Sequence, residues 1–302
     1  MATIAWIGLG NMGGPMTANL VKAGHTVRGF DLNPAALDAA VANGVTRTAS
    51  IADAMEGADV AFTMLPKGEH ARAVHLGEGG IMTHARPGML LVDSSTIDVE
   101  TAGHLHEAAR ERGLRFVDAP VSGGISGASA GTLTFMIGGE DADVAEAKTY
   151  IAPMAGSMIA TGAATTGQAA KICNNMMLFI EMQACAEAAV LAGRLGLDAQ
   201  VFWDIVNVSS GACWAQKTWY PVPGIVPTAA ANRGFDATFA ASLAHKDAHL
   251  ALAAAEQVGL DLPAARVATE GLDKLMADGF GDKDCSLVIR NIDPNAPGVP
   301  QG

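Results

Sequence analysis

Short apolar runs alternate with stretches of helical periodicity over the first half of the chain. The segments between the runs repeat apolar residues at helical spacing. This alternation is typical of a parallel sheet with helices on both faces. The predicted strands are Ile4–Ile7, Thr26–Phe30, Val60–Leu65, Leu90–Asp93, Arg115–Asp118, Thr134–Ile137 and Met158–Ala160. We therefore predict an α/β domain over residues 1–162, built on a doubly wound, mainly parallel sheet.

The strand pattern stops after Gly162, and the second half of the chain is helical in pattern. One pattern of about 30 residues runs to Gly196, and further helical segments follow to about Ile292. Residues 163–292 are therefore predicted to form an all-α C-terminal domain, joined to the sheet by a long helix. Because that helix is rich in Ala and Met and poor in charge, we expect it to be packed on most sides, partly against another subunit. Residues 293–302, rich in Pro and Gly, are predicted to be a flexible tail.

Composition and charge limit the partners that we expect. The chain has 302 residues, of which 50% are hydrophobic, enough for two cores. Nineteen basic and 31 acidic residues give a net charge of −12, which opposes binding to nucleic acid and to anionic membranes. The N-terminus enters an apolar run without a basic segment before it, so we expect no secretion signal and a cytoplasmic location.

The sequence contains a long apolar run and four cysteines, but neither indicates a membrane protein or a disulfide-bonded protein. The apolar run from Ala163 to Leu195 is long enough to span a bilayer, but its polar residues favour a buried helix. These are Lys171, Asn174, Asn175, Glu181, Glu187 and Arg194. The four cysteines have no C-x-x-C spacing, so we expect reduced core thiols without a zinc site or a disulfide framework. They are Cys173, Cys185, Cys213 and Cys285.

A glycine-rich turn follows the first predicted strand and precedes a predicted helix. The sequence Gly-Leu-Gly-Asn-Met-Gly at residues 8–13 has the spacing and context of a Rossmann-like dinucleotide site. In that arrangement Gly8 allows the tight turn, Gly10 lets a pyrophosphate approach the backbone, and Gly13 lets the helix pack close to the strand. The helix N-terminus offers N–H groups and positive potential to the phosphates. The predicted cofactor contacts here are Gly8, Gly10, Asn11, Met12 and Gly13.

Asp31 ends the second predicted strand, at the distance expected for a carboxylate that binds the adenosine ribose hydroxyls. A carboxylate there repels a 2′-phosphate, and the next residues contain no Arg to attract one. The sequence therefore favours NAD over NADP as the cofactor. An ordinary solvated Asp at a strand end is the alternative. Asn33 and Pro34 then predict a helix start, with Asn as the N-cap and Pro at the first position.

Lys171 is a cation in an otherwise apolar stretch rich in Ala and Met. Burial pushes down the pKa of an ammonium group, which can make it an acid and base near neutral pH. On a helix Gly167, Lys171 and Asn175 share one face, with Gly167 leaving room for another group to approach. This stripe is a candidate half of an active site. The alternative is a lysine that lays its stem along a core helix.

Further segments complete a pattern of motifs. They are Asp-Ala-Pro-Val-Ser-Gly-Gly at residues 118–124, the stripe at 167–175 and Leu-Ala-His-Lys-Asp at 243–247. With the glycine-rich turn, these four motifs in this order make the chain resemble the β-hydroxyacid dehydrogenases over nearly its whole length. Ser209–Trp214 and Tyr220–Gly224 are similar to the loop of the 3-hydroxyisobutyrate dehydrogenases within that family. Trp219 lies where relatives often have Tyr, and the loss of that hydroxyl is expected to alter substrate binding.

The resemblance implies a role for each matching residue. Lys171 would take the proton from the substrate hydroxyl as hydride leaves the same carbon for the nicotinamide, with Asn175 beside it as the second catalytic residue. The implied substrate contacts are Ser122, Gly123, Gly124, Trp214 and Phe239. The implied further cofactor contacts are Leu65, Pro66, Thr96, Lys246 and Asp247. Without the resemblance, Ser-Gly-Gly is more typical of a turn, and Lys-Asp is more typical of a solvated helix face. The two aromatic residues are as typical of a core as of a substrate site.

His245 and His249 are one helical turn apart, a spacing at which two histidines can bind zinc. The sequence offers no glutamate base between them and no evident third ligand, so we predict no metal site.

The resemblance implies an NAD-dependent oxidation of 3-hydroxyisobutyrate to methylmalonate semialdehyde, a step of valine catabolism. Rival substrates within the family are L-serine, 3-hydroxypropionate and tartronate semialdehyde. A non-catalytic dinucleotide-binding module is the alternative of another class, and Lys171 argues against it. The expected partners are a small hydroxyacid and further copies of the chain, as a homodimer or homotetramer.

Overall fold

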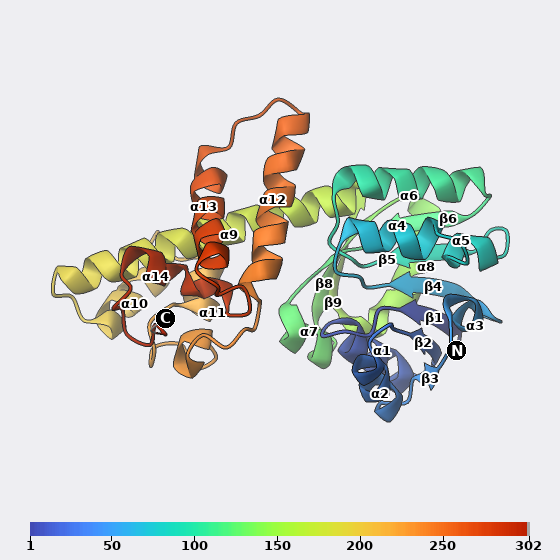
Figure 1. The fold of residues 1–302 in the computed structure, drawn as a ribbon, viewed down its shortest axis with the longest axis horizontal. Coiled ribbons are helices and arrows are strands. Elements are labelled where there is room, and N and C mark those ends of the chain that lie inside the picture. Colours follow the sequence, from blue (N-terminus) through green and yellow to red (C-terminus); the bar gives the residue numbers. More distant parts are fainter. Residues whose placement is uncertain (301–302) are drawn as a thin grey trace. The chain divides into compact units, whose positions relative to one another are not determined.

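The computed structural model describes residues 1–300 and forms two compact units, Met1–Lys171 and the remainder from Ile172 onward. The first unit is α/β and the second is helical, and the long helix α9 (Thr166–Arg194) begins in the first and continues through the second (Figure 1). Residues 301 and 302 of the predicted tail lie outside the described part of the chain.

One nine-stranded sheet, in the order β3-β2-β1-β4-β5-β6-β8-β7 with β9 beside β8, forms the frame of the first unit. The pairs from β3 across to β6 are parallel, β8 pairs antiparallel with β6 and β7, and β9 returns parallel to β8. The predicted doubly wound, mainly parallel sheet is therefore confirmed. Its strands are β1 (Thr3–Ile7), β2 (Thr26–Phe30), β3 (Thr46–Arg47), β4 (Val60–Thr63), β5 (Leu90–Asp93), β6 (Arg115–Asp118), β7 (Val121–Ser122), β8 (Leu133–Gly138) and β9 (Ala155–Gly162).

Helices cover both faces of this sheet. Along β1, Ile4 and Trp6 belong to one apolar cluster and Ala5 and Ile7 to another, as the alternation of side chains along a strand requires. Both clusters are closed to solvent, which explains why the strands read as continuous apolar runs. The helices are α1 (Gly13–Lys22), α2 (Pro34–Ala42), α3 (Ile51–Met55), α4 (Gly68–Leu76), α5 (Ile81–His84), α6 (Val99–Glu111), α7 (Gly124–Ala130), α8 (Asp141–Ile151) and the 3-10 turn η1 (Ala152–Met154).

The structure corrects the prediction at four strands. The two-residue strands β3 and β7 were not predicted; both side chains of β3 are exposed, so no apolar run marks it. The strand β4 ends at Thr63, so Leu65 lies in the following loop and does not end the strand. The strand β9 is longer than predicted, and its mostly exposed or half-exposed side chains give no apolar signal beyond its middle.

In the second unit, helices pack against one another through small side chains. Ala241, Ala244 and Ala248 of α12 lie in one cluster with Leu272 and Leu275 of α13. Small side chains on α12 let its neighbours approach closely. Among residues 172–300 the regular elements are helical, apart from two isolated bridges between segments near residues 236–240 and 283–284. After α9, the helices and 3-10 turns of this unit are α10 (Ala199–Asn207), α11 (Trp214–Trp219), η2 (Ala230–Arg233), α12 (Ala241–Gln257), α13 (Pro263–Ala277), η3 (Cys285–Val288) and α14 (Ile289–Ile292).

Helix α9 buries one stripe and leaves the rest of its surface open. The buried stripe repeats at helical spacing and consists of Gln168, Lys171, Ile172, Asn175, Phe179, Met182 and Ala186. Met177 is 59% and Leu191 61% exposed. By length and composition the helix could cross a membrane, and only 28% of its most apolar window is buried within the chain. Within a single chain the helix is not packed on most sides, so the further packing expected against another subunit stays a prediction.

Two smaller expectations also change. Residues 293–300 form no helix or strand, yet Ala296 and Val299 are buried in the second unit's core, so this segment is not wholly unpacked as a flexible tail would be. All four cysteines are free thiols, but Cys173 is exposed and is not a core residue. The sulfur atoms of Cys185 and Cys213 lie 3.7 Å apart.

Candidate active site

The glycine-rich turn lies between β1 and α1, where its three glycines have distinct surroundings. A Cβ on Gly8, whose φ is +97°, would lie 2.2 Å from the Met64 carbonyl oxygen, and one on Gly13 would lie 2.0 Å from the Gly8 carbonyl oxygen. Side chains are therefore excluded there by the packing of the turn. In contrast, nothing lies within 4 Å of a Cβ on Gly10, so the backbone has open space in front of it. No side chain caps the N-terminus of α1, and its first turn contains no acidic residue.

Asp31 connects this turn to the end of β2. Its Oδ2 accepts a hydrogen bond from the Leu9 backbone N–H at 2.6 Å, and its Oδ1 accepts one from the Asn33 N–H at 2.7 Å. Asn33 then caps α2 by accepting from the Ala35 N–H at 3.0 Å, as predicted. The carboxylate therefore holds the glycine-rich turn in place, a task that the sequence analysis did not assign to it. Each oxygen keeps a further lone pair for a ribose hydroxyl.

A buried network holds the loops that follow β4 and β5. The Asp93 Oδ1 accepts from the hydroxyls of Thr63 at 2.6 Å and Ser95 at 2.5 Å, and the Ser95 hydroxyl in turn accepts from the Leu65 N–H at 2.8 Å. The Leu65 side chain lies against the Gly8 position. Because β1, β4 and β5 are adjacent and parallel, Gly8, Leu65 and Thr96 lie at the same edge of the sheet.

His75 completes this network from α4. Its Nε2 lies 3.1 Å from the Thr63 hydroxyl, whose single proton goes to Asp93, so His75 must donate from Nε2. Burial lowers the pKa of His75 to about 4, against a smaller opposing effect of the Asp93 charge. His75 is therefore neutral at physiological pH.

The start of α9 is fixed by the carboxylate of Asp118, at the end of β6. Its Oδ1 accepts from the Thr165 N–H at 2.9 Å and lies 2.8 Å from the His106 Nε2, and its Oδ2 accepts from the Gln168 N–H at 2.8 Å. The Gln168 side chain binds the loop after β5, donating to the Ser95 carbonyl at 2.7 Å and accepting from the Ile97 N–H at 3.1 Å. Neither Gln168 nor a role for Asp118 was predicted from the sequence.

Lys171 follows one turn after this anchor and is 8% exposed. Its helix position is therefore set by buried hydrogen bonds to the ends of β5 and β6. The role predicted for Gly167 is corrected: a Cβ there would lie 2.5 Å from the Asp118 carbonyl oxygen and 2.6 Å from that of Met136. Gly167 lets the helix pack against the sheet backbone and leaves no room for a ligand.

Ser122, Gly123 and Gly124 lie where β7 passes into α7. Gly123 has φ +132° and Gly124 has φ +63°, so both adopt backbone conformations that favour glycine. Both glycines are exposed, and a Cβ on Gly124 would meet nothing within 4 Å. The backbone here is open to a small ligand.

In the second unit, Asn175, Lys246 and Asp247 come together. Asp247, 5% exposed, accepts a hydrogen bond from the Asn175 Nδ2 at 2.8 Å through Oδ2, and its Oδ1 lies 2.9 Å from the Lys246 Nζ. The Asn175 Oδ1 accepts from the Asn174 Nδ2 at 3.1 Å. These contacts orient the Asn175 amide. On α9, Asn175 is one turn beyond Lys171, so the two side chains share a helix face.

Trp214 and Phe239 are joined through Trp219. The rings of Trp214 and Trp219 pack edge to face at 5.1 Å, and those of Trp219 and Phe239 stack at 6.2 Å. Phe239 also stacks on Phe179 of α9 at 6.2 Å, and Phe179 is one turn beyond Asn175. The buried Asp284 carboxylate holds Phe239 by accepting from its N–H at 3.1 Å. From the sequence, Trp219 was expected only to replace a Tyr of relatives, and Phe179 was not predicted.

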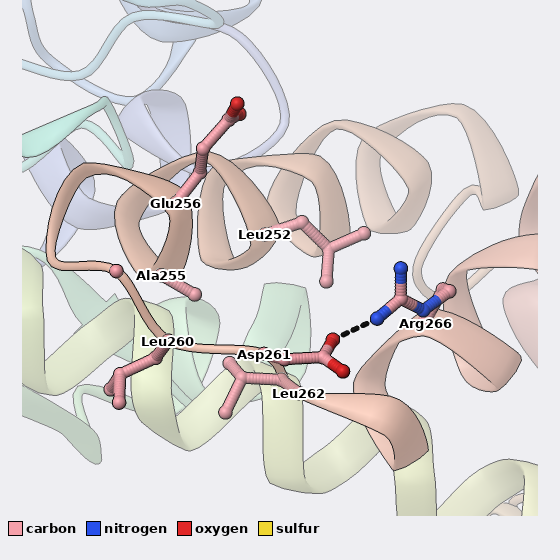
Figure 2. A pocket seen from close by; sticks show the side chains of 8 residues that line it. Leu252, Ala255, Glu256, Leu260, Asp261, Leu262 and Arg266 are labelled. Atoms are coloured by element: carbon pink, nitrogen blue, oxygen red, sulfur yellow. Dashed lines mark hydrogen bonds and ion pairs between the residues drawn. The ribbon is translucent and has the colours of Figure 1, made fainter.

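A cavity of about 440 Å³ lies elsewhere, at the turn between α12 and α13 (Figure 2). Asp261 and Arg266 form an ion pair on its wall. None of the predicted site residues lines it. Its lining residues are Leu252, Ala255, Glu256, Gly259, Leu260, Asp261, Leu262 and Arg266.

Comparisons with known proteins cover both units. Residues 3–167 match the model of the NAD-binding domain of 6-phosphogluconate dehydrogenase, and residues 165–292 match that of the NAD-binding domain of NADP-dependent 3-hydroxyisobutyrate dehydrogenase. A probable 3-hydroxyisobutyrate dehydrogenase of Mycobacterium tuberculosis (strain ATCC 25618 / H37Rv) is 47% identical over 97% of this chain and 98% of its own. An NAD-dependent L-serine dehydrogenase of Pseudomonas aeruginosa is 41% identical over 97% and 99%.

A solved structure described as Mycobacterium tuberculosis 3-hydroxyisobutyrate dehydrogenase with L-serine superposes with a TM-score of 0.92. It is 47% identical and covers 97% of this chain and 99% of its own.

Proposed function

Because the chain belongs to the β-hydroxyacid dehydrogenase family and is an NAD-dependent dehydrogenase of hydroxyacids, we propose that it oxidises 3-hydroxyisobutyrate to methylmalonate semialdehyde, a step of valine catabolism. The buried Lys171 on α9, one turn from the oriented Asn175, is the observation that carries the chemistry. The choice of substrate rests on the relative that is 47% identical over nearly its whole length.

The glycine-rich turn fits a dinucleotide. The open space before Gly10 and the uncapped N-terminus of α1 suit a pyrophosphate, since helix N-termini bind anions through backbone N–H groups. Gly8, Asn11, Met12 and Gly13 belong to the same turn, and Leu65, Pro66 and Thr96 to the loops after β4 and β5. In the second unit Lys246 and Asp247 are the proposed cofactor contacts. The family matched by residues 165–292 is described as NADP-dependent. Asp31 nevertheless favours NAD as the cofactor of this chain, because its carboxylate repels the 2′-phosphate of NADP.

Lys171 is the proposed acid and base. When bound, NAD⁺ accepts the hydride from the carbon that carries the substrate hydroxyl. The Lys171 Nζ takes the hydroxyl proton in this direction and returns it in the other. Asn175 is the second proposed catalytic residue, since the Asp247 carboxylate fixes its amide for a hydrogen bond to the reacting groups.

The remaining residues are proposed to hold the substrate. Ser122, Gly123 and Gly124 offer a hydroxyl and backbone N–H groups to its carboxylate. Trp214 and Phe239, linked by Trp219, offer apolar surface to its methyl group.

L-Serine is a second candidate substrate, supported by the relative named L-serine dehydrogenase. Absorbance at the NADH band distinguishes the two. The purified protein is given NAD⁺ with each enantiomer of 3-hydroxyisobutyrate, L-serine or 3-hydroxypropionate, and each assay is repeated with NADP⁺. We expect the highest kcat/KM with one 3-hydroxyisobutyrate enantiomer and NAD⁺. An equal or higher value with L-serine would replace the first substrate by the second.

Lys171→Ala tests the chemistry itself. Turnover should fall by about 10² or more, the usual contribution of a general base, while NAD⁺ still binds. Lys22→Ala, an exposed lysine on α1, is the matched control and should leave turnover unchanged. Unchanged turnover in Lys171→Ala would exclude the proposed mechanism.

A homodimer or homotetramer is also proposed. Exposed apolar side chains on α9, α10 and the residue after it support this, with Leu191 at 61%, Ile205 at 50% and Val208 at 85% exposure. Light scattering at micromolar concentration measures the mass, and a monomer would contradict the proposal.

A further inference from the structure

His245 and His249 of α12 and Asp273 of α13 form a cluster of metal-ligating atoms on the second unit. The Nε2 atoms of both histidines lie 2.8 Å from the same carboxylate oxygen, Asp273 Oδ1. The two imidazole rings lie 4.4 Å apart, and one ligand atom from each of the three residues lies within 4.8 Å of the others. Asp273 supplies the third ligand that was not evident in the sequence.

We propose that these three residues bind a divalent transition-metal ion, with zinc as the best-suited ion. Two imidazole nitrogens and one carboxylate oxygen are ligands that zinc prefers, whereas calcium and magnesium prefer oxygen alone. Zinc at about 2.0–2.1 Å from each ligand places tetrahedral ligand atoms about 3.3 Å apart. The observed 2.8 Å separations therefore need to widen by only about half an ångström to admit the ion.

The site is accessible to ions from solvent. The side chains of His245, His249 and Asp273 are 31%, 47% and 46% exposed. Water can therefore complete the fourth position. Lys274, the cation beside Asp273, is paired with Asp278 at 2.9 Å.

A metal here would act as a cross-link between two helices. It would join α12 to α13 along a face of α12 beside the buried residues Ala244, Asp247 and Ala248. His245 directly precedes Lys246, so the ion would also stiffen the segment that carries the proposed cofactor contacts. The metal is assigned no part in the hydride transfer, so this proposal does not depend on the proposed substrate.

Calorimetric titration of chelator-treated protein with zinc chloride tests the proposal. One zinc per chain is expected, together with a rise in Tm of about 4 °C at saturating zinc. His249→Gln and Asp273→Asn should each weaken zinc binding by about 100-fold or more, because each removes one of three ligands. Far-UV circular dichroism checks that these variants fold, which is expected since both side chains are partly exposed.

Two control variants make the result specific. His104→Gln changes an exposed histidine on α6, and Cys173→Ser removes an exposed thiol, which could bind zinc by itself. Both should bind zinc as the unaltered protein does. Zinc binding that survives in His249→Gln and Asp273→Asn, or that is lost in Cys173→Ser, would place the metal elsewhere and overturn the proposal. No zinc binding by the unaltered protein would leave the cluster as a hydrogen-bonded surface group and also overturn it.

Discussion

The two units hold their candidate site residues by different kinds of contact. In the α/β unit the fully buried carboxylates of Asp93 and Asp118 bind hydroxyls and backbone N–H groups, and so fix whole loops. In the helical unit Asp247 binds two side chains, those of Asn175 and Lys246. Asp284 is the exception, since it holds the backbone at Phe239.

The two kinds of contact control different things: the first fixes the path of the backbone, and the second fixes the orientation of side chains. A carboxylate that accepts from backbone N–H groups sets where a strand ends and a helix begins, so its loss leaves buried donors without partners. A carboxylate that holds side chains sets only which way they point. We therefore expect changes in the first unit to lower stability and activity together, and changes at Asp247 to lower mainly activity.

The largest effect is expected for Asp118→Ala. The change leaves the N–H groups of the part-buried Thr165 and the buried Gln168 without their acceptor and removes the partner of His106. The free energy of unfolding should fall by about 3–5 kcal/mol. Turnover should fall as well, because the start of α9 places Lys171. Urea denaturation and the NADH assay measure the two effects.

Glu111→Ala, an exposed carboxylate at the end of α6, is the control for Asp118→Ala and should change stability by less than about 0.5 kcal/mol. A loss below about 1 kcal/mol in Asp118→Ala would mean that the α9 N-terminus is held by packing and not by this carboxylate.

Features that depend on residues close together in the sequence could be predicted, and features that depend on residues far apart could not. The glycine-rich turn and the Asn33 cap depend on residues within one turn of each other, and both were predicted correctly. The four central parallel strands were also predicted, because burial on both faces makes them continuously apolar. The strand β3 has two exposed residues and carries no such pattern.

Long-range contacts at the candidate site were beyond the sequence pattern. Asp118 and Gln168 are 50 residues apart, and nothing local marks either as an anchor. Asp273 likewise lies on a different helix from His245 and His249. Gly167 was interpreted as space for a ligand, although the sheet backbone fills that space. A glycine in a helix signals a close approach, and the sequence does not say of what.

A smaller effect on stability is expected from protonation of His75, which adds a positive charge to the buried network of Thr63 and Asp93 in the first unit. Burial lowers the pKa of His75 to about 4, below its ordinary 6.5. Between these values the unfolded chain binds a proton that the folded chain excludes, so stability is full above about pH 6.5 and falls as pH drops toward 4. The loss should reach about 3 kcal/mol.

Urea denaturation of the unaltered protein and of His75→Gln, at pH 7.5 and at about pH 4.5, isolates this contribution. Gln can still donate to Thr63, so the variant should fold. It should lose less stability than the unaltered protein over the same pH range. Equal losses in the two proteins would show that His75 does not carry the pH dependence.

The smallest effect on stability is expected for Asp247→Asn, and it decides the comparison. The Asn oxygen can still accept from the Asn175 amide, but the ion pair with Lys246 is lost. We expect the KM for NAD⁺ to rise about 10-fold, equivalent to about 1.4 kcal/mol. The free energy of unfolding should fall by only about 1–2 kcal/mol, because the hydrogen bond with Asn175 remains and the Lys246 side chain keeps some contact with solvent. Asp278→Asn, which breaks the exposed pair with Lys274, is the matched control and should leave the KM unchanged. If Asp247→Asn destabilised the protein as much as Asp118→Ala, the helical unit would also depend on its carboxylate for shape, and the distinction between the two units would not hold.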